Sequence, residues 1–469
     1  MSNNESNPAA EKSRIFVVPH THWDREWYLP FQHFRFKLVE LIDELLEILS
    51  KQNYFFMLDG QTIVIEDYFE IRPEKRKELL KYIKKGNIAV GPWYLLPDEW
   101  LVSAESLVRN LEVSFELAKE LDIPLMNVGY LPDQFGHTQA IPQILANLTS
   151  ISSTVLWRGV GEEINTVPFT WKSHKNASSS VLGVYMPFGY GNAASLSEDS
   201  EILKEQIEQF VDDLNTYSPI PIYLLMNGTD HQIPNPKLMQ LLETLDDEEK
   251  NIILCLLDYY VDELLKSIKE RNYHPPEYCG EFRSSARAHL LQDTYSTRMW
   301  IKQWNQKVED KLVNHAEPIS LYSWLFFGKE YPSSYLSLAW KWLLKNHPHD
   351  SICGCSVDQT HEEMKSRFYW AESIADSVVK DSLSFLKEEK QSSEKSTLIV
   401  FNPTNCSETP SYFEFTLPLD MKIRGLKSKI GTFYEIQPLS SSEEIIFEDT
   451  LSPVMVKAGI KLLDRKSVV

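Results

Sequence analysis

The chain has 469 residues, more than one domain usually contains, so we expect two or three domains, each with its own core. Its formal net charge of -20 at pH 7 argues against nucleic acid as a partner, because proteins that bind phosphates carry clustered Lys and Arg. No apolar run approaches the ~20 residues that a membrane helix needs, so we expect no membrane partner.

The first 14 residues are polar, and they lack the charged, apolar and small segments of a secretory signal. We therefore predict a disordered tail over residues 1–14 and a cytoplasmic protein. The five cysteines are few and odd in number, which favours free thiols in a reducing compartment. Cys353 and Cys355 lack the two-residue spacer and the second Cys pair of a zinc or redox motif, so we interpret them as packed or loop cysteines.

From residue 15 to about residue 226, short apolar runs alternate with longer helical patterns, which is typical of parallel strands joined by crossover helices. The expected strands are residues 15–18, 54–58, 88–90, 126–130, 154–157 and 222–226. Polar or aromatic residues follow each run, and the carboxyl ends of parallel strands form the rim where ligands bind. These residues include His20, His22, Asp24, Asp59, Trp93, Asp133, Arg158 and Asp230.

From about residue 280, apolar spacing over residues 296–304, 319–327 and 336–344 predicts long amphipathic helices and hence a helical bundle. Ser356 followed by Gln359 forms a capping box for a helix that runs to about residue 386. Strand-like runs at 397–401 and 412–417 predict an incomplete β domain. The expected domains are a catalytic α/β domain (15–279), a helical bundle (280–386), a linker (387–396) and a truncated β domain (397–469).

The first cluster of candidate functional residues is His20, His22 and Asp24, spaced two residues apart. On extended chain this spacing places the three side chains on one face, as metal ligands require. Imidazole and carboxylate together suit Zn²⁺, and Mn²⁺ or Co²⁺ also fit by ligand type. The alternative interpretation is a pair of hydrogen-bonded histidines at a strand end.

Three later segments add carboxylates and imidazoles. Asp133, after the fourth strand, could be a ligand, a nucleophile or a helix cap. Asp230 lies in a turn-forming segment, but two carboxylates facing an acetal also supply the acid and the nucleophile or base of glycoside hydrolysis. His349 and Asp350 follow a helix and a stiffening Pro348. We expect the remaining histidines, including His361, to be exposed to solvent.

These four segments, in this order, resemble glycoside hydrolase family 38, the zinc-dependent retaining α-mannosidases, and in particular its bacterial cytoplasmic members. The resemblance covers residues 14–405 and is carried by residues 20–28, 132–137 and 349–354. It implies an N-terminal seven-stranded distorted (β/α) barrel, then a helical bundle, then the start of a β-sandwich-like domain. Family members continue well beyond the position of Val469, so we expect most of the C-terminal β region to be lacking.

The resemblance also implies roles for individual residues. It makes His22, Asp24, Asp133 and His349 the ligands of one Zn²⁺ per chain, with Asp133 as nucleophile as well. Asp230 would be the general acid/base, in a mechanism that retains anomeric configuration through a covalent glycosyl-enzyme. Substrate contacts would come from Trp27, Arg158 and Asp350, and less clearly from Tyr190, whereas His20 would not be a ligand.

Other functions stay open at the level of sequence. A metal-dependent amidohydrolase or deacetylase also begins with His-x-His after its first strand, and it would use metal-activated water. A hydrolase of phosphorylated mannosylglycerate would need basic residues near the site. A third alternative is an inactive, truncated fragment that binds sugar. The expected partner is an oligosaccharide or mannoside substrate, and a homodimer is left open.

Overall fold

The computed structural model describes residues 12–245 and 250–389, together with four strands between residues 412 and 461. Most of the predicted N-terminal tail, most of the predicted linker and the predicted strand at 397–401 lie outside the described residues. Within the described ranges, no helix combines the length and the apolar character needed to cross a bilayer.

The first sheet is built around one largely buried strand, β1, which pairs in parallel with three others. The apolar run Ile15 to Val18 is 0% exposed, as expected for a parallel strand covered on both faces. The sheet contains β1 (Ser13–Thr21), β2 (Phe56–Leu58), β3 (Ile88–Ala89), β8 (Ile222–Asn227) and β9 (Lys250–Leu254).

The second sheet has the order β10-β6-β7-β5-β4, and only its β6–β7 pair is antiparallel. Its strands are β4 (Gly129–Leu131), β5 (Ser153–Leu156), β6 (Phe169–Lys172), β7 (Ser180–Tyr185) and β10 (Glu277–Cys279). A backbone hydrogen bond from Met126 N to Val90 O links this half to the first sheet. The α/β class is therefore confirmed. The ten strands β1 to β10 pair as two five-stranded sheets, so a single seven-stranded barrel is not confirmed.

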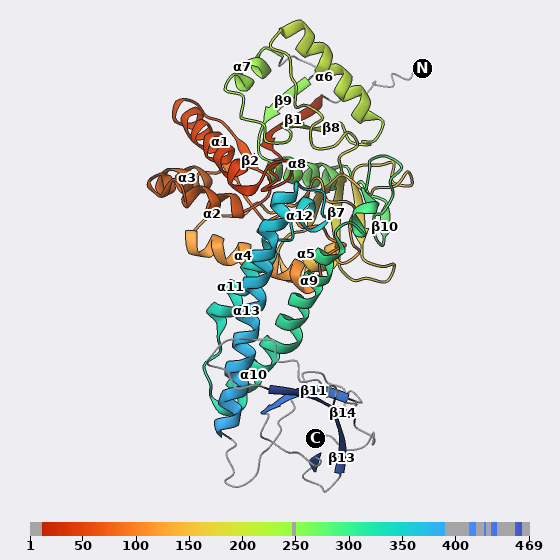
Figure 1. Ribbon diagram of the computed structural model, residues 1–469. Helices are drawn as coiled ribbons and strands as arrows, with labels where there is room; N and C mark the ends of the chain where they lie inside the picture. Colours follow the sequence, from red (N-terminus) through yellow and green to blue (C-terminus); the bar gives the residue numbers. More distant parts are fainter. Residues whose placement is uncertain are drawn as a thin grey trace, which may run out of the picture.

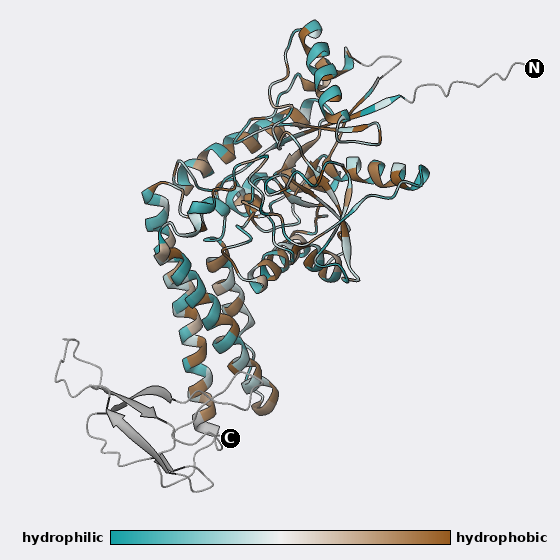
Figure 2. Cartoon of the chain, turned by 90° about the vertical axis from the view of Figure 1, so that its right-hand side faces the viewer, coloured by the Kyte–Doolittle hydropathy of each residue, from teal (hydrophilic) through white to brown (hydrophobic). Residues whose placement is uncertain are grey.

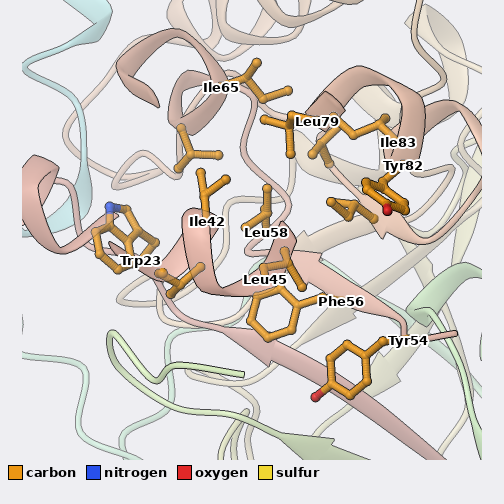
Figure 3. Close-up of a cluster of buried hydrophobic side chains, with 14 of the residues drawn as sticks. Trp23, Ile42, Leu45, Tyr54, Phe56, Leu58, Ile65, Leu79, Tyr82 and Ile83 are labelled. Carbon is orange, nitrogen blue, oxygen red and sulfur yellow. The ribbon is translucent and has the colours of Figure 1, made fainter. Parts of the chain in front are cut away.

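Helices cover these strands with apolar faces. In α1, buried residues such as Phe34, Leu38 and Leu45 recur at helical spacing. Figure 3 shows Leu45 of α1 beside Phe56 and Leu58 of β2 in this core. The helices of this part are α1 (Phe31–Lys51), α2 (Ile63–Phe69), α3 (Arg76–Lys84), α4 (Ala104–Leu121), α5 (Ile141–Leu148), α6 (Ser200–Asn215), α7 (Leu238–Glu243) and α8 (Leu257–Glu270), with a short 3-10 turn at Pro73–Lys75.

The helical bundle extends away from the α/β part, as Figures 1 and 2 show from two directions. Its long helix α13 packs against α10 and α11 around a separate core that includes Trp340, Met364 and Phe368. The elements are α9 (Met299–Asp310), a π-helical turn (Lys311–Ala316), α10 (Glu317–Phe327), α11 (Ser333–Leu344), α12 (His349–Ile352) and α13 (Asp358–Glu389), preceded by a 3-10 turn at Gln292–Tyr295. The predicted bundle is therefore present.

One expectation in the bundle is wrong. His361 is only 1% exposed, and its Nε2 lies 3.0 Å from the carbonyl oxygen of Ser356. The reason is the spacing of His361, Met364 and Phe368, which places the imidazole on the buried face of α13 although its sequence neighbours are polar.

At the C-terminal end, four strands form an antiparallel sheet in the order β11-β14-β13-β12. They are β11 (Tyr412–Pro418), β12 (Leu426–Lys427), β13 (Phe433–Pro438) and β14 (Met455–Lys461). The predicted strand at 412–417 is confirmed, whereas a β-sandwich is not.

Candidate metal centre and active site

The register of β1 places His22 between two carboxylates. The ladder of β1 with β8 continues past Pro19 and Asn227 to a parallel bridge between His22 and Asp230. On the other side, Thr21 pairs with Leu58, so that Asp59 lies next to His22. The approach of β8 to β1 requires glycine at position 228, because a Cβ there would lie 1.9 Å from the His20 carbonyl oxygen.

Asp59 fixes the orientation of the His22 ring. The two oxygens of its carboxylate lie 3.2 and 3.0 Å from Nδ1 of His22, and one of them accepts the Trp23 backbone N–H at 2.8 Å. Because a carboxylate only accepts, Nδ1 donates to Asp59, and Nε2 is the ring nitrogen that faces the site.

His349 reaches the same place from the bundle. The chain around it docks against residues 96–98: His349 N donates to Leu96 O, and Asp98 N donates to His347 O. His349 Nδ1 lies 3.5 Å from the Leu96 carbonyl oxygen, so Nε2 is the nitrogen of this ring that faces the site. Two imidazoles from distant segments therefore face one point.

Asp24 lies at that point and is shared by both rings. Its Oδ1 is 3.2 Å from His22 Nε2 and 3.4 Å from His349 Nε2, and the three residues are buried. Burial alone would raise the pKa of the Asp24 carboxyl, but the two imidazoles lower it well below its usual range. Asp24 is therefore ionised.

Asp133 contacts the cluster from the second sheet. Leu131 of β4 pairs with Leu156 of β5, and two residues further along each chain Asp133 meets Arg158, whose Nε donates to Oδ1 at 2.6 Å. The other oxygen, Oδ2, lies 3.5 Å from His349 Nε2. Burial opposes ionisation, but His349 and Arg158 lower the pKa of Asp133.

The arrangement can be tested for its fit to a metal ion. Two ligand atoms that each lie about 2.0 to 2.1 Å from a tetrahedral zinc ion are about 3.4 Å apart. The separations of Asp24 Oδ1 from His22 Nε2 and from His349 Nε2, 3.2 and 3.4 Å, match that value. Asp133 Oδ2 meets this group at His349 Nε2, at 3.5 Å, and is not among the donors that all lie close to one another. Nε2 of His22 and Nε2 of His349 are both buried and make no hydrogen bond. The donors can therefore hold a zinc-sized cation.

The charges of the site also favour a bound cation. Burial disfavours imidazolium, yet Asp59 and Asp24 raise the pKa of His22 well above its usual value. Asp350 and Asp133 likewise raise the pKa of His349 to about 9. The surrounding carboxylates thus favour a positive charge where the two rings meet, which a cation supplies.

Asp230, which follows β8, is held by Tyr190. The tyrosine hydroxyl donates to Asp230 Oδ1 at 2.8 Å, and its ring lies 4.8 Å from that of His22. Burial, reinforced by the nearby carboxylates, raises the pKa of Tyr190, so the hydroxyl keeps its proton. Asp230 is therefore oriented beside the metal-ligand cluster.

The other predicted residues lie at different distances from the cluster. Asp350 Oδ2 is 3.8 Å from His349 Nε2, and Trp27 is anchored next to the bundle because its carbonyl accepts the Val357 N–H. His20 does not join the cluster: its Nε2 lies 2.8 Å from the Tyr190 carbonyl oxygen. The spacing of His20, His22 and Asp24 therefore predicted one residue too many.

Two residues that position this site were given no role from sequence. Asp59 was placed only at a strand end, and its contact with His22 depends on the register of β1 and β2. Glu26 is 0% exposed and accepts hydrogen bonds from Ser351 in α12 and from Arg367 in α13. An acidic residue within segment 20–28, which carries the family resemblance, was the signal that could have identified it.

Comparison with known families identifies the family of the chain. Residues 12–282 match the model of the glycosyl hydrolases family 38 N-terminal domain, and residues 289–386 match that of the alpha mannosidase middle domain. The first match alone covers more than half of the chain. The chain belongs to glycoside hydrolase family 38.

Individual relatives agree with that assignment. A protein of Halalkalibacterium halodurans named "Putative mannosylglycerate hydrolase" is 33% identical over 384 residues, which are 78% of this chain and 42% of the relative. An alpha-mannosidase of Saccharomyces cerevisiae is 21% identical over 391 residues, 81% of this chain and 34% of that protein.

A solved structure, the alpha-mannosidase of Enterococcus faecalis V583, superposes with a TM-score of 0.82 at 28% identity, covering 96% of this chain and 54% of that one. The chain spans about half the length, or less, of these three proteins.

Proposed function

We propose that this chain carries the catalytic site of a zinc-dependent retaining α-mannosidase, which releases terminal α-linked mannose from glycans or mannosides. The observation that carries the proposal is the convergence of His22, Asp24 and His349, with Asp133 in contact at His349. A zinc ion there would be held by His22, Asp24 and His349, and it would supply a positive charge that stabilises the bound sugar.

Asp133 is the proposed nucleophile. Its lowered pKa keeps the carboxylate ionised, and Arg158 holds one of its oxygens in place. The carboxylate attacks the anomeric carbon as the glycosidic bond breaks, which forms a glycosyl ester on Asp133.

Asp230 is the proposed general acid/base. In its protonated form it gives a proton to the departing oxygen, and it then takes a proton from the water that hydrolyses the ester. The hydroxyl of Tyr190 donates to one oxygen of Asp230, which leaves the other oxygen for this transfer. Two displacements at the same carbon retain its configuration.

Trp27 and Asp350 are the proposed sugar contacts, as an apolar surface under the ring and a hydrogen-bond acceptor for its hydroxyls. Both depend on the junction between the α/β part and the bundle, since Trp27 O accepts a hydrogen bond from Val357 and Asp350 follows His349. We therefore propose that residues 15–279 and 280–386 act as one catalytic unit.

A second candidate substrate is mannosylglycerate. It is favoured by the name of the relative that is 33% identical over most of this chain. The same nucleophile and acid/base would serve, because the bond to be broken is again an α-mannoside. Membership of family 38 disfavours the amidohydrolase alternative.

The mechanism is tested by the configuration of the first product. We expect proton NMR of aryl α-mannoside hydrolysis by the full chain to show α-mannose before it mutarotates, and Asp133→Ala to abolish the reaction. Release of β-mannose, or full activity of Asp133→Ala, would contradict the mechanism. Parallel reactions on mannosylglycerate, with its phosphorylated form as control, distinguish the candidate substrates.

A further inference from the structure

The loop that follows His349 gathers a second set of potential ligands. Asp350, Cys353 and Cys355 each offer one donor atom, and all three atoms lie within 4.8 Å of one another. The Cys355 thiol donates to Asp350 Oδ1 over 3.0 Å. None of these three atoms belongs to the set formed by His22, Asp24 and His349.

The loop backbone holds both thiols on the same side. The carbonyl oxygen of Asp350 accepts from the Cys353 thiol at 3.6 Å and from the Ser356 hydroxyl at 2.9 Å, and the Cys355 sulfur lies 3.7 Å from the same oxygen. Gly354, with φ +88°, makes the turn between the two cysteines. The two thiols are therefore in position before any ligand arrives.

Two cationic side chains fix this loop from outside. Lys302 donates to the Cys353 carbonyl at 2.6 Å, and Arg298 donates to the Gly354 carbonyl at 3.1 Å. Both side chains bind backbone carbonyls of the loop and not the ligand atoms of Asp350, Cys353 and Cys355. Cys353 is buried whereas Cys355 is exposed, so the cluster is reached from solvent at Cys355.

We propose that Asp350, Cys353 and Cys355 form a second cation site, specific for thiophilic divalent ions such as Cd²⁺ or excess Zn²⁺. Two sulfurs and one carboxylate oxygen are donors that such ions prefer, and a solvent water completes four ligands. Binding forms two metal–sulfur bonds, and the two thiol protons are released to the buffer. The site is not evident from the sequence. The cysteines are separated by one residue, which is not the spacing of a known metal motif, and the third ligand is Asp350.

The site has a consequence for catalysis that rests on the proposed function. Asp350 Oδ1 would bind the second ion, while Oδ2 lies 3.8 Å from His349. An ion held there withdraws Asp350 from the sugar hydroxyls and places a second positive charge beside the first centre. Thiophilic ions should therefore inhibit hydrolysis.

The test is a Cd²⁺ titration of the full, reduced chain already loaded with one equivalent of zinc. We expect the ultraviolet charge-transfer absorption of cadmium–thiolate bonds, saturating at one further ion, with release of two protons. Cys355→Ser should lose the absorption or weaken binding at least tenfold. The matched control Cys279→Ser removes another exposed cysteine, on β10, and should bind as the unaltered chain does.

Absence of the absorption in the unaltered chain, or its loss in Cys279→Ser but not in Cys355→Ser, would overturn the proposal. Proton release provides a second measurement that does not depend on spectral assignment. Cadmium–thiolate absorption in a chain that hydrolyses no mannoside would support this site and contradict the proposed function. Inhibition by Cd²⁺ that Cys355→Ser relieves would support both.

Discussion

Glu26 and Arg367 form a buried ion pair between segments that lie 341 residues apart in the chain. Nη2 of Arg367 lies 2.8 Å from each oxygen of Glu26, and Oε1 also accepts the Ser351 hydroxyl at 2.7 Å. The pair connects the segment that carries His22 and Asp24 with the helix that follows His349. It therefore fixes the junction on which the metal-ligand cluster depends.

We expect Glu26→Gln to lower the free energy of unfolding by about 3 to 5 kcal/mol, because it leaves the buried guanidinium without its anionic partner. Urea unfolding of the full chain measures the change. The matched control is Glu47→Gln, which breaks the exposed pair with Lys51 and should have no measurable effect. Equal midpoints for the two variants would show that the junction does not depend on Glu26.

We expect Asp59→Asn to weaken zinc binding about 10- to 100-fold, since the loss of a carboxylate partner on a ligating imidazole typically has that effect. Asp59 contacts His22 Nδ1 and the backbone of Trp23, so the substitution changes ring orientation without removing a ligand. Competition with a chromophoric chelator measures the affinity. Asp43→Asn, in the part-exposed pair with Arg72, is the control, and equal affinities in both variants would refute this role of Asp59.

His361 should make the fold sensitive to acid. Burial, together with the charge of Arg298, lowers the pKa of His361 to about 4, so the folded state binds its proton less readily than the unfolded chain does. Its contribution to stability is present above about pH 6.5 and is lost as the pH falls through about 4. Urea midpoints should therefore fall less steeply with acid in His361→Gln than in the unaltered chain.

The exposed His33 provides the control for this prediction. His33→Gln should leave the acid dependence as it is in the unaltered chain. If His361→Gln and His33→Gln gave the same slope between pH 6.5 and 4, the buried imidazole would not be the cause.

The fold could be predicted from sequence where apolar runs were isolated. Strand β8 follows a helix and a turn, so its run was distinct, and it appears at residues 222–227. Strand β9 was missed because its apolar residues run directly into helix α8, and periodicity cannot divide such a stretch. Strands β6 and β7 were missed as well, and they form the one antiparallel pair of their sheet.

The site was predictable in its residue types and less so in its geometry. Local spacing offered His20 and His22 as equivalent ligands, but His20 bonds the Tyr190 backbone and His22 meets Asp59. That difference depends on strand pairing and not on spacing. The approach of His349 to Asp24 depends on the docking of the bundle, which no local pattern contains, so only the family resemblance indicated it.

The most direct test of the central claim is the hydrolysis of an aryl α-mannoside by the full chain before chelation, after chelation and after zinc is returned. We predict that removal of the metal abolishes hydrolysis and that one equivalent of Zn²⁺ restores it. Undiminished hydrolysis by the metal-free chain, or no hydrolysis by the zinc-loaded chain, would contradict the account.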